Sequence, residues 1–172
     1  MVRAKLRKLY KLRKIQKEPM RTPECVKDLY PIGLIVEDVL TAINSYIEQH
    51  EVNIQYNRAE DIEVLLNKGL IEHAFKNIII NAVQAMPDGG KLTVSTVYLH
   101  GVFVKVVFED TGEGIKKDNM DKIFNPFYTT KKKSSGLGLL IVQKIIEAHG
   151  GAISVLSKEG NGTVFEILLP IR

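Results

Sequence analysis

The sequence predicts an α+β fold in which helices cover one face of a mixed, largely antiparallel sheet. Three observations support this prediction. Helix-type and strand-type hydrophobic patterns are interspersed along the chain, two pairs of strand-type segments are joined by short turns, and the helix-type segments are amphipathic. Such elements pack as two layers. The 172 residues are enough for one domain with its own hydrophobic core.

Composition places the chain among globular domains outside the membrane. It is 45% hydrophobic and 26% charged, and no apolar run approaches the ~20 residues of a membrane span. No apolar segment follows the basic N-terminus, so a secretory signal is not expected. The single cysteine, Cys25, excludes an internal disulfide and suits a reducing compartment. We expect a cytoplasmic location, although the parent protein could be attached to a membrane.

The positive charge is concentrated at the N-terminus. Residues 1–22 contain nine Lys/Arg and one Glu, a net charge of +8, whereas the other 150 residues contain fifteen Lys/Arg and nineteen Asp/Glu, a net charge of −4. The basic pI therefore belongs to the N-terminal segment, and nucleic acid is not an expected partner of the folded domain.

Residues 1–18 are predicted to form a basic helix, because Leu6, Leu9, Leu12 and Ile15 recur at three-residue steps. Prolines at positions 19 and 23 end it. The segment is best interpreted as the end of a longer helix or helical bundle, and a nucleic-acid or membrane-surface arm is the alternative. We assign 1–22 to this segment and linker, and 23–172 to the domain.

Residues 31–50 are predicted to form the next helix, with Ile35, Val39, Ile43 and Ile47 on one face. Two short strands follow, at residues 52–56 and 64–66.

The helix predicted over 69–86 has an unusual polar face. Its apolar stripe consists of Ile71, Ala74, Phe75, Ile78, Ala82 and Ala85. On the other side, at steps of four, four and three, stand His73, Asn77, Asn81 and Gln84. Solvent-exposed helix faces usually carry Lys and Glu, so two Asn residues one turn apart favour the wall of a cleft, with an ordinary solvent face as the alternative.

The second half of the chain reads as hairpins and one more long helix. Pro87–Gly90 forms a turn, the strands 91–99 and 102–109 form a hairpin, and Asp118 can cap a short helix that runs through Ile123. The following helix begins at the glycine-rich sequence SSGLGL and stops at Gly150 and Gly151. Strands 153–156 and 163–169 close the domain around the turn EGNG.

The stretch from Phe108 to Gly138 contains the residues expected to bind a ligand. A glycine-rich helix start with lysines nearby is an anion site, because its backbone N–H groups have no partner within the helix. A buried carboxylate at a strand end, Asp110, is placed to accept a hydrogen bond from an amine. Together these features predict a pocket with an adenine end and a phosphate end.

Four sequence boxes, in order and at matching spacing, carry a family resemblance: HAFKNIIINAVQAMPDGG, EDTGEGI, KIFNPFYTTK and SGLGLLIVQKIIEAHGG. The region from Lys27 to Arg172 resembles the catalytic, ATP-binding domain of bacterial sensor histidine kinases, of the GHKL or Bergerat-fold superfamily. The resemblance implies a two-layer α/β sandwich that binds ATP and Mg²⁺.

The resemblance also implies roles for individual residues. Asn81 would be the Mg²⁺ ligand, with Asn77 beside the phosphates one turn earlier. Mg²⁺ prefers six oxygen ligands, so one amide needs the nucleotide phosphates to complete the shell. Asp110 would accept from the adenine amine, supported by Thr163, and would disfavour guanine, whose carbonyl would face another acceptor.

Residues 116–135 correspond to the family's lid over the phosphates. Phe124 and Phe127 are expected to anchor its base, and Gly112 and Gly114 to let the backbone approach the base of the nucleotide. Asn77 and Lys131 are assigned catalytic roles. The remaining nucleotide-binding residues implied by the resemblance are Gln84, Ile115, Phe127, Thr130, Ser135, Gly136, Leu137, Gly138 and Leu139. The family's usual Gly-Thr before GLGL is replaced by Ser134-Ser135, so details of lid closure could differ.

Two absences from the sequence refine the expected reaction. Hydrolytic members of the superfamily carry a glutamate where this chain has Asn77, which cannot act as a general base. The acceptor histidine of the kinases lies in a preceding helical hairpin, and none of His50, His73, His100 or His149 has that context. We therefore expect each of them to be structural.

The expected function is transfer of the γ-phosphoryl group of Mg-ATP to a histidine on a separate dimerisation domain. Its partners would be that domain and a response regulator, in a homodimeric parent protein. The alternatives are a serine kinase of the anti-sigma-factor kind, a hydrolytic superfamily member that dimerises with ATP, and a nucleotide-binding module without activity.

Overall fold

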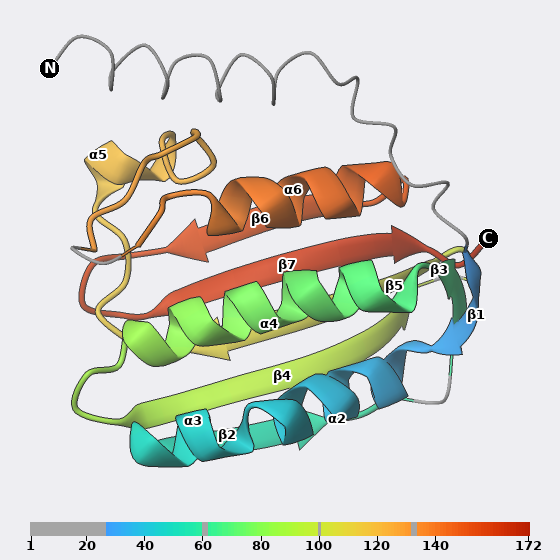
Figure 1. Ribbon diagram of the computed structural model, residues 1–172, viewed down its shortest axis with the longest axis horizontal. Helices are drawn as coiled ribbons and strands as arrows, with labels where there is room; N and C mark the ends of the chain where they lie inside the picture. The colour runs from blue at the N-terminus through green and yellow to red at the C-terminus, as the bar shows by residue number, and fades with distance from the viewer. Residues whose placement is uncertain (1–26, 60–61, 100, 132–133) are drawn as a thin grey trace, which may run out of the picture.

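The computed structural model describes residues 27–59, 62–99, 101–131 and 134–172 (Figure 1). Its strands are β1 (Asp28–Pro31), β2 (Val52–Asn57), β3 (Glu63–Leu66), β4 (Gly90–Leu99), β5 (Phe103–Asp110), β6 (Ala152–Ser157) and β7 (Thr163–Pro170). Its helices are α2 (Ile32–Ala42), α3 (Asn44–Gln49), α4 (Lys68–Gln84), α5 (Lys117–Met120) and α6 (Gly138–Ala148). The helix predicted over 1–18 lies outside the described residues.

The main sheet has five strands in the order β2-β4-β5-β7-β6. The β2–β4 pair is parallel and the other three pairs are antiparallel. The helices α2, α4 and α6 lie on the same face of this sheet, as Figure 1 shows. The predicted two-layer fold with a mixed, mostly antiparallel sheet is therefore confirmed. Both predicted hairpins, β4–β5 and β6–β7, are present.

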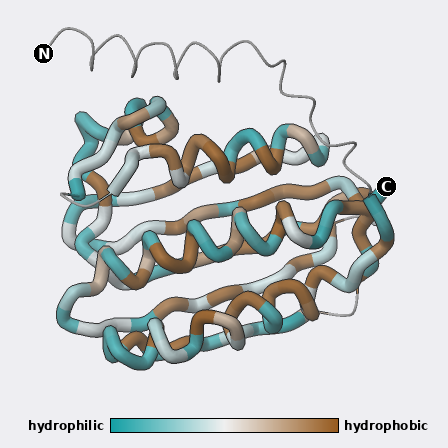
Figure 2. Tube along the Cα trace, in the orientation of Figure 1, coloured by the Kyte–Doolittle hydropathy of each residue, from teal (hydrophilic) through white to brown (hydrophobic). Residues whose placement is uncertain are grey.

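The core fills the space between the two layers, and the apolar stretches along the helices and strands are visible in Figure 2. The stripe of α4 supplies its centre, where Ile71, Phe75 and Ile78 are completely buried. The rings of Phe75 and Phe108 are 5.3 Å apart and inclined by 60°, a favourable aromatic arrangement. Burial of the stripe turns the other side of α4, with its two Asn residues, toward α6 and the end of the sheet.

The helix predicted over 31–50 is two helices. The backbone leaves the helical conformation at Ile43 (φ −117°, ψ 14°), whose carbonyl accepts from the N–H groups of Tyr46 and Ile47. Ile43 and Ile47 are nevertheless buried, as the pattern predicts. The hydrophobic period identifies a buried face, and it does not reveal a single non-helical residue within it.

Two smaller elements differ from the predictions. The strand β1 was not predicted, and it pairs antiparallel with β3 in a separate two-stranded sheet. The short helix α5 ends at Met120 and not at Ile123, and Lys116 is its N-cap. Asp118 therefore lies inside the first turn and makes no capping hydrogen bond, although its charge is favourable there. Within the described ranges, none of the helices combines the length and the apolar character needed to cross a bilayer.

Candidate functional site

A row of polar side chains crosses one end of the sheet. Asp110, the last residue of β5, is paired with Thr163 at the start of β7, and Thr163 is paired with Ser157 at the end of β6. Directly opposite residues of neighbouring strands point to the same face, and here that face is the one covered by helices. Asp110 and Thr163 are each only 4% exposed. Strand register therefore places three hydrogen-bonding groups side by side at the edge of the core.

Asp110 keeps one oxygen available for a ligand. Its Oδ1 accepts from the N–H groups of Gly112 (2.9 Å) and Thr163 (3.2 Å), and its Oδ2 has no partner among the described residues. No fully buried side-chain oxygen or nitrogen in that part of the chain lacks a partner, so Oδ2 must reach the adjoining cavity. Burial raises the pKa of Asp110, opposed by the two backbone N–H groups and by Lys131.

The cavity beside Asp110 has a volume of about 580 Å³ and is bordered by both layers. That volume lies in the range typical of small-molecule and cofactor sites. Of the sequence-predicted residues, those that line it are Asn81, Asp110, Gly114, Ile115, Thr130, Lys131, Gly136, Gly138, Leu139 and Thr163. Those outside its lining are Asn77, Gln84, Gly112, Phe127, Ser135 and Leu137.

The start of α6 presents free backbone donors at the cavity. Its N-cap, Leu137, makes no side-chain capping bond, and the first helical hydrogen bond joins the Ile141 N–H to the Leu137 carbonyl. The N–H groups of Gly138, Leu139 and Leu140 have no partner among the described residues. Unpaired N–H groups and the helix dipole together attract anions. Asn77 of α4 faces this helix start, since its Oδ1 lies 3.6 Å from where a Cβ of residue 138 would stand.

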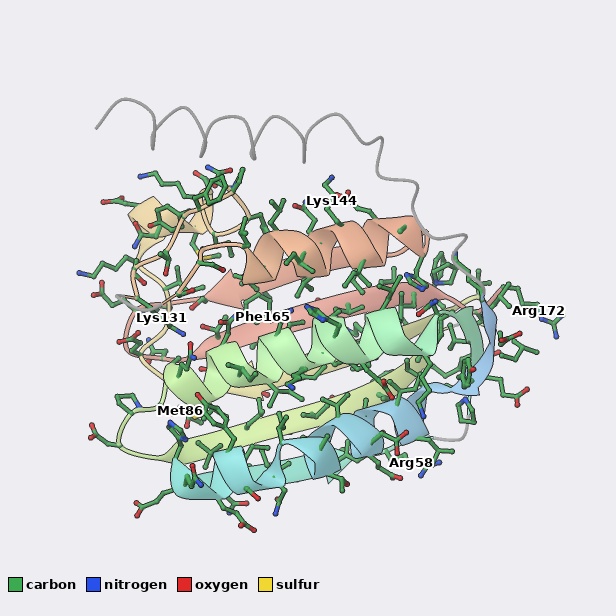
Figure 3. All side chains as sticks on the ribbon, viewed as in Figure 1. Arg58, Met86, Lys131, Lys144, Phe165 and Arg172 are labelled. Carbon is green, nitrogen blue, oxygen red and sulfur yellow. The ribbon has the colours of Figure 1, made fainter. Side chains whose placement is uncertain are left out.

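Lys131 connects the lid to the end of α4. Its Nζ donates to Oε1 of Gln84 at 3.0 Å and to the carbonyl oxygen of Asn81 at 3.4 Å. Partial burial lowers its pKa, while the nearby carboxylates of Glu113 and Asp110 act in the opposite direction. Figure 3 shows Lys131 at the same end of the sheet as Phe165, which also lines the cavity. A cation is thus held at the cavity from the lid side.

Gly112 and Gly114 also have close protein neighbours, which gives a second reason for glycine at these positions, one that was not predicted. A Cβ on Gly112 would lie 2.5 Å from the carbonyl oxygen of Ala85, at the end of α4. Gly114 has a φ of +69°, and a Cβ there would collide with the backbone of Lys158 in the β6–β7 turn. Both glycines allow their loop to pack between these two backbones, and this packing shapes the wall of the cavity.

The prediction that Phe127 anchors the lid base is wrong. Its side chain is 76% exposed, and its backbone has a φ of +65°. The Phe127 N–H donates to the Gly136 carbonyl at 3.0 Å, which joins the two ends of the loop 127–136. The residue thus contributes a backbone contact, and its ring points away from the core. Phe124 is half-buried.

His149 lies at the opposite end of α6, as a structural residue. Its Nδ1 is 2.7 Å from the Ile145 carbonyl, and its Nε2 accepts from the Asn67 N–H at 3.0 Å. Nδ1 must therefore carry the proton. Burial is the main cause that lowers the pKa of His149. The ring of His50 packs against that of Tyr46 at an angle of 44°, and His73 is exposed, while His100 lies outside the described residues.

Sequence reasoning missed several residues that line the cavity, among them Phe165, Tyr128 and Glu113. It also missed Ser157, which is outside the lining and contacts two residues within it, Thr163 and Ile115. Phe165 stands two residues after Thr163 on β7. Because alternate residues of a strand face the same side, the sequence could have placed Phe165 on the same face as Thr163. Ser157 hydrogen-bonds to Thr163, to the Gly162 carbonyl and to the Ile115 N–H. Those contacts depend on the pairing of β6 with β7, which no local pattern reveals.

The residues around the cavity offer few ligands for Mg²⁺. Within the described ranges, no group of three or more His, Cys, Asp or Glu side chains is arranged to hold a metal ion. Asn81 is one of the residues that line the cavity, and its amide oxygen is a suitable Mg²⁺ ligand when other oxygens complete the shell. The residues fit a metal that is bound jointly with an anionic ligand, and they do not provide a complete protein site.

Comparison with known proteins identifies the class of this fold and site. Residues 67–172, more than half of the chain, match the family described as Histidine kinase-, DNA gyrase B-, and HSP90-like ATPase. The chain belongs to this family.

Within that family, the similar proteins are histidine kinases. The chain is 38% identical to sporulation kinase E of Bacillus subtilis (strain 168) over 139 residues, which is 80% of this chain and 19% of that protein. It is 32% identical to the sensor histidine kinase ZraS of Escherichia coli (strain K12) over 82% of this chain and 30% of ZraS. The chain therefore spans less than a third of these relatives.

A solved structure of the nucleotide-free catalytic domain of histidine kinase ThkA has the same fold. The TM-score is 0.77 at 28% identity, over 84% of this chain and 95% of that one. ThkA has also been solved in complex with the response regulator protein TrrA, and there the TM-score is 0.75 at 26% identity, over 97% of this chain and 49% of that one.

Proposed function

We propose that this domain binds ATP together with Mg²⁺ and transfers the γ-phosphoryl group to a histidine on a separate dimerisation domain. The observation that carries the proposal is the polarity of the cavity. Hydrogen-bond acceptors stand at one part of its wall, at Asp110 and Thr163, and donors at another, at the start of α6 and at Lys131. A ligand with an amino group at one end and phosphates at the other is complementary to both.

At the nucleobase end, the Oδ2 of Asp110 would accept from the exocyclic amine of adenine. The two backbone N–H groups on Oδ1 hold the carboxylate in place. A carbonyl in place of the amine would face an acceptor in a buried position, and an unpaired buried group costs about 1–3 kcal/mol. The site should therefore prefer adenine to guanine.

At the phosphate end, the free N–H groups of Gly138, Leu139 and Leu140 would bind phosphate oxygens. Lys131 would give up its bonds to Gln84 and Asn81 for the terminal phosphate, and Asn77 would lie beside the phosphates at the helix start. Asn81 and the phosphates would hold Mg²⁺ jointly, and the ion would neutralise charge that develops during transfer. Gly136, Thr130 and Ile115 would enclose the nucleotide from the loops.

Transfer to an acceptor is favoured over hydrolysis, because the residue one turn before Asn81 is Asn77, which cannot deprotonate water. Among the described residues no histidine lines the cavity, and both ring nitrogens of His149 are engaged. The chain's own groups would thus position the phosphoryl donor, and another polypeptide segment would supply the acceptor imidazole.

We further propose a cytoplasmic location and a response regulator as the final phosphoryl acceptor. The complex of ThkA with TrrA supports such a partner. A dimerisation domain elsewhere in the parent protein, carrying the acceptor histidine, would make that protein a homodimer.

Phosphotransfer from γ-labelled ATP tests the proposed function. The chain is incubated with Mg²⁺, first alone and then with the separately produced histidine hairpin of its parent protein. Acid-labile label on the added hairpin only is the expected result. ATP binding without any labelled hairpin would contradict it and favour a serine kinase or an inactive module. Rapid phosphate release without an acceptor would show that Asn77 does not prevent hydrolysis.

A further inference from the structure

The hydroxyl of Ser157 is fully occupied by three partners. It lies 2.8 Å from the Ile115 nitrogen, 2.9 Å from the Gly162 carbonyl oxygen and 2.9 Å from the Thr163 hydroxyl oxygen. A serine hydroxyl has one proton to donate and two lone pairs that accept. The three contacts therefore use the complete hydrogen-bonding capacity of Ser157.

The chemistry of two of these partners determines the direction of the third bond. A backbone N–H can only donate, so Ile115 takes one lone pair of Ser157. A carbonyl can only accept, so the single proton of Ser157 goes to Gly162. Ser157 then has only a lone pair left for Thr163, and the Thr163 hydroxyl must be the donor of their bond.

With its proton directed at Ser157, the Thr163 hydroxyl offers only lone pairs to the cavity that it lines. Its neighbour Asp110 is also an acceptor, and the two are linked by the bond from the Thr163 N–H to Oδ1. We propose that Ser157, by orienting the Thr163 hydroxyl, makes the nucleobase end of the cavity an acceptor-only surface and so strengthens selection of an amine over a carbonyl. This inference deepens the proposed function and rests on it.

Ser157 is not part of the cavity lining, so its effect on base selection would pass through the hydroxyl of Thr163, while its bond to the Ile115 N–H supports the neighbouring loop. In Ser157→Ala the Thr163 hydroxyl loses its fixed acceptor and becomes free to rotate. It could then donate to the carbonyl of guanine as readily as it accepts from the amine of adenine. The variant should therefore lose discrimination between the two bases more than it loses affinity for ATP.

Calorimetric titration of ATP and GTP into the wild-type chain, Ser157→Ala and Ser154→Ala tests this inference. Ser154 is the matched control, since it lies on the same strand, is exposed, and its hydroxyl donates to Glu166 on the other face of the sheet. We expect the ratio of the GTP and ATP dissociation constants to fall about tenfold in Ser157→Ala, and to remain at the wild-type value in Ser154→Ala.

An unchanged ratio in Ser157→Ala, or equal weakening of both nucleotides, would overturn the inference, since it would show that Ser157 only supports the fold. Failure of the wild-type chain to bind ATP would instead overturn the proposed function. If Ser157→Ala does not fold, the direction of the Thr163 hydroxyl can still be tested on the wild-type chain alone. NMR should detect a slowly exchanging Thr163 hydroxyl proton close to Ser157, and a Thr163 proton directed elsewhere would refute the assignment.

Discussion

The two ends of the α4–α6 helix pair differ in how completely their backbone groups are bonded. The helices run antiparallel, because Asn67 at the start of α4 contacts His149 at the end of α6, and Asn77 faces the start of α6. At the His149 end, the Asn67 side chain caps α4 by accepting from the Leu70 N–H at 3.0 Å, and the imidazole satisfies both Asn67 and Ile145.

At the other end, the start of α6 has no side-chain cap, and three successive N–H groups have no partner among the described residues. Helix starts of this kind are less stable than capped ones by about 1 kcal/mol. The comparison teaches that one end of the pair holds the fold together, whereas the other leaves hydrogen-bonding groups free for a ligand. Changes at the first end should alter stability without altering binding, and changes at the second should do the reverse.

Asp110→Asn should have the largest effect and should act on binding alone. Asparagine can keep the bonds from Gly112 and Thr163 through its oxygen, but it then presents an NH₂ group to the amine of adenine. Two facing donors in a buried position should weaken ATP binding about 100-fold. Isothermal titration measures the affinity, and Glu109→Gln removes the same charge from the exposed neighbouring residue as a control. Wild-type affinity in Asp110→Asn would contradict the assignment of the nucleobase end.

His149→Ala should affect stability alone. The Asn67 N–H loses its acceptor, so the free energy of unfolding should fall by about 2 kcal/mol, measured by urea denaturation. ATP affinity should be unchanged, and His73→Ala, at an exposed position, should change neither quantity. Weaker ATP binding in His149→Ala, at a temperature where the variant is folded, would contradict the assignment of stability to one end of the helix pair and binding to the other.

The pKa of His149 also predicts how stability depends on pH. Because the folded chain lowers this pKa, the unfolded chain takes up a proton near pH 6.5 while the folded chain resists it. The stabilisation from the neutral imidazole is therefore complete above about pH 6.5 and is lost progressively as the pH falls below it. The slope between pH 7 and 5.5 should be smaller in His149→Ala, and an identical slope would argue against the neutral form.

Asn81→Ala should remove the effect of Mg²⁺ on ATP binding while the fold persists. Loss of a metal ligand should reduce ATP affinity in the presence of Mg²⁺ by at least about tenfold, and affinity without the metal should change little. Asn53→Ala, at an exposed position outside the cavity, is the matched control. Equal affinity of the wild-type chain for ATP with and without Mg²⁺ would refute the assignment of Asn81.

Phe127→Gly should have the smallest effect, because its ring is exposed and its φ is positive. Glycine adopts this conformation without strain, so the free energy of unfolding should stay constant or rise by up to about 1 kcal/mol. Thermal denaturation measures the change. A marked loss of stability would show that the ring packs against the domain after all.

The sequence was sufficient to predict those parts of the fold that follow from the local spacing of apolar residues and from turn residues. Burial of every third or fourth residue predicted α4, and turn residues predicted both hairpins. The positions of Asn81, Asp110 and the α6 start followed from these elements and from the family resemblance. Their roles in binding remain predictions.

Features that depend on tertiary context could not be predicted in the same way. The break at Ile43 does not alter the apolar pattern, and β1 is four residues long and ends in a proline. Ser157 acquires its role from three contacts to residues brought together by the sheet and its loops. Phe127 looked like a core residue from its chemistry, but the backbone conformation at that position turns it outward.

The cross-strand row of Ser157, Thr163 and Asp110 also has a consequence for how sequences of this type can diverge. Because successive strand residues face opposite sides, deleting one residue within β5 or β7 would turn part of this row toward solvent, whatever amino acids remained. Substitutions leave strand length intact and are far less disruptive. Insertions and deletions among descendants of this chain should therefore accumulate at the β4–β5 hairpin tip around Gly101 and in the loop between α5 and α6, while the lengths of the three strands stay constant.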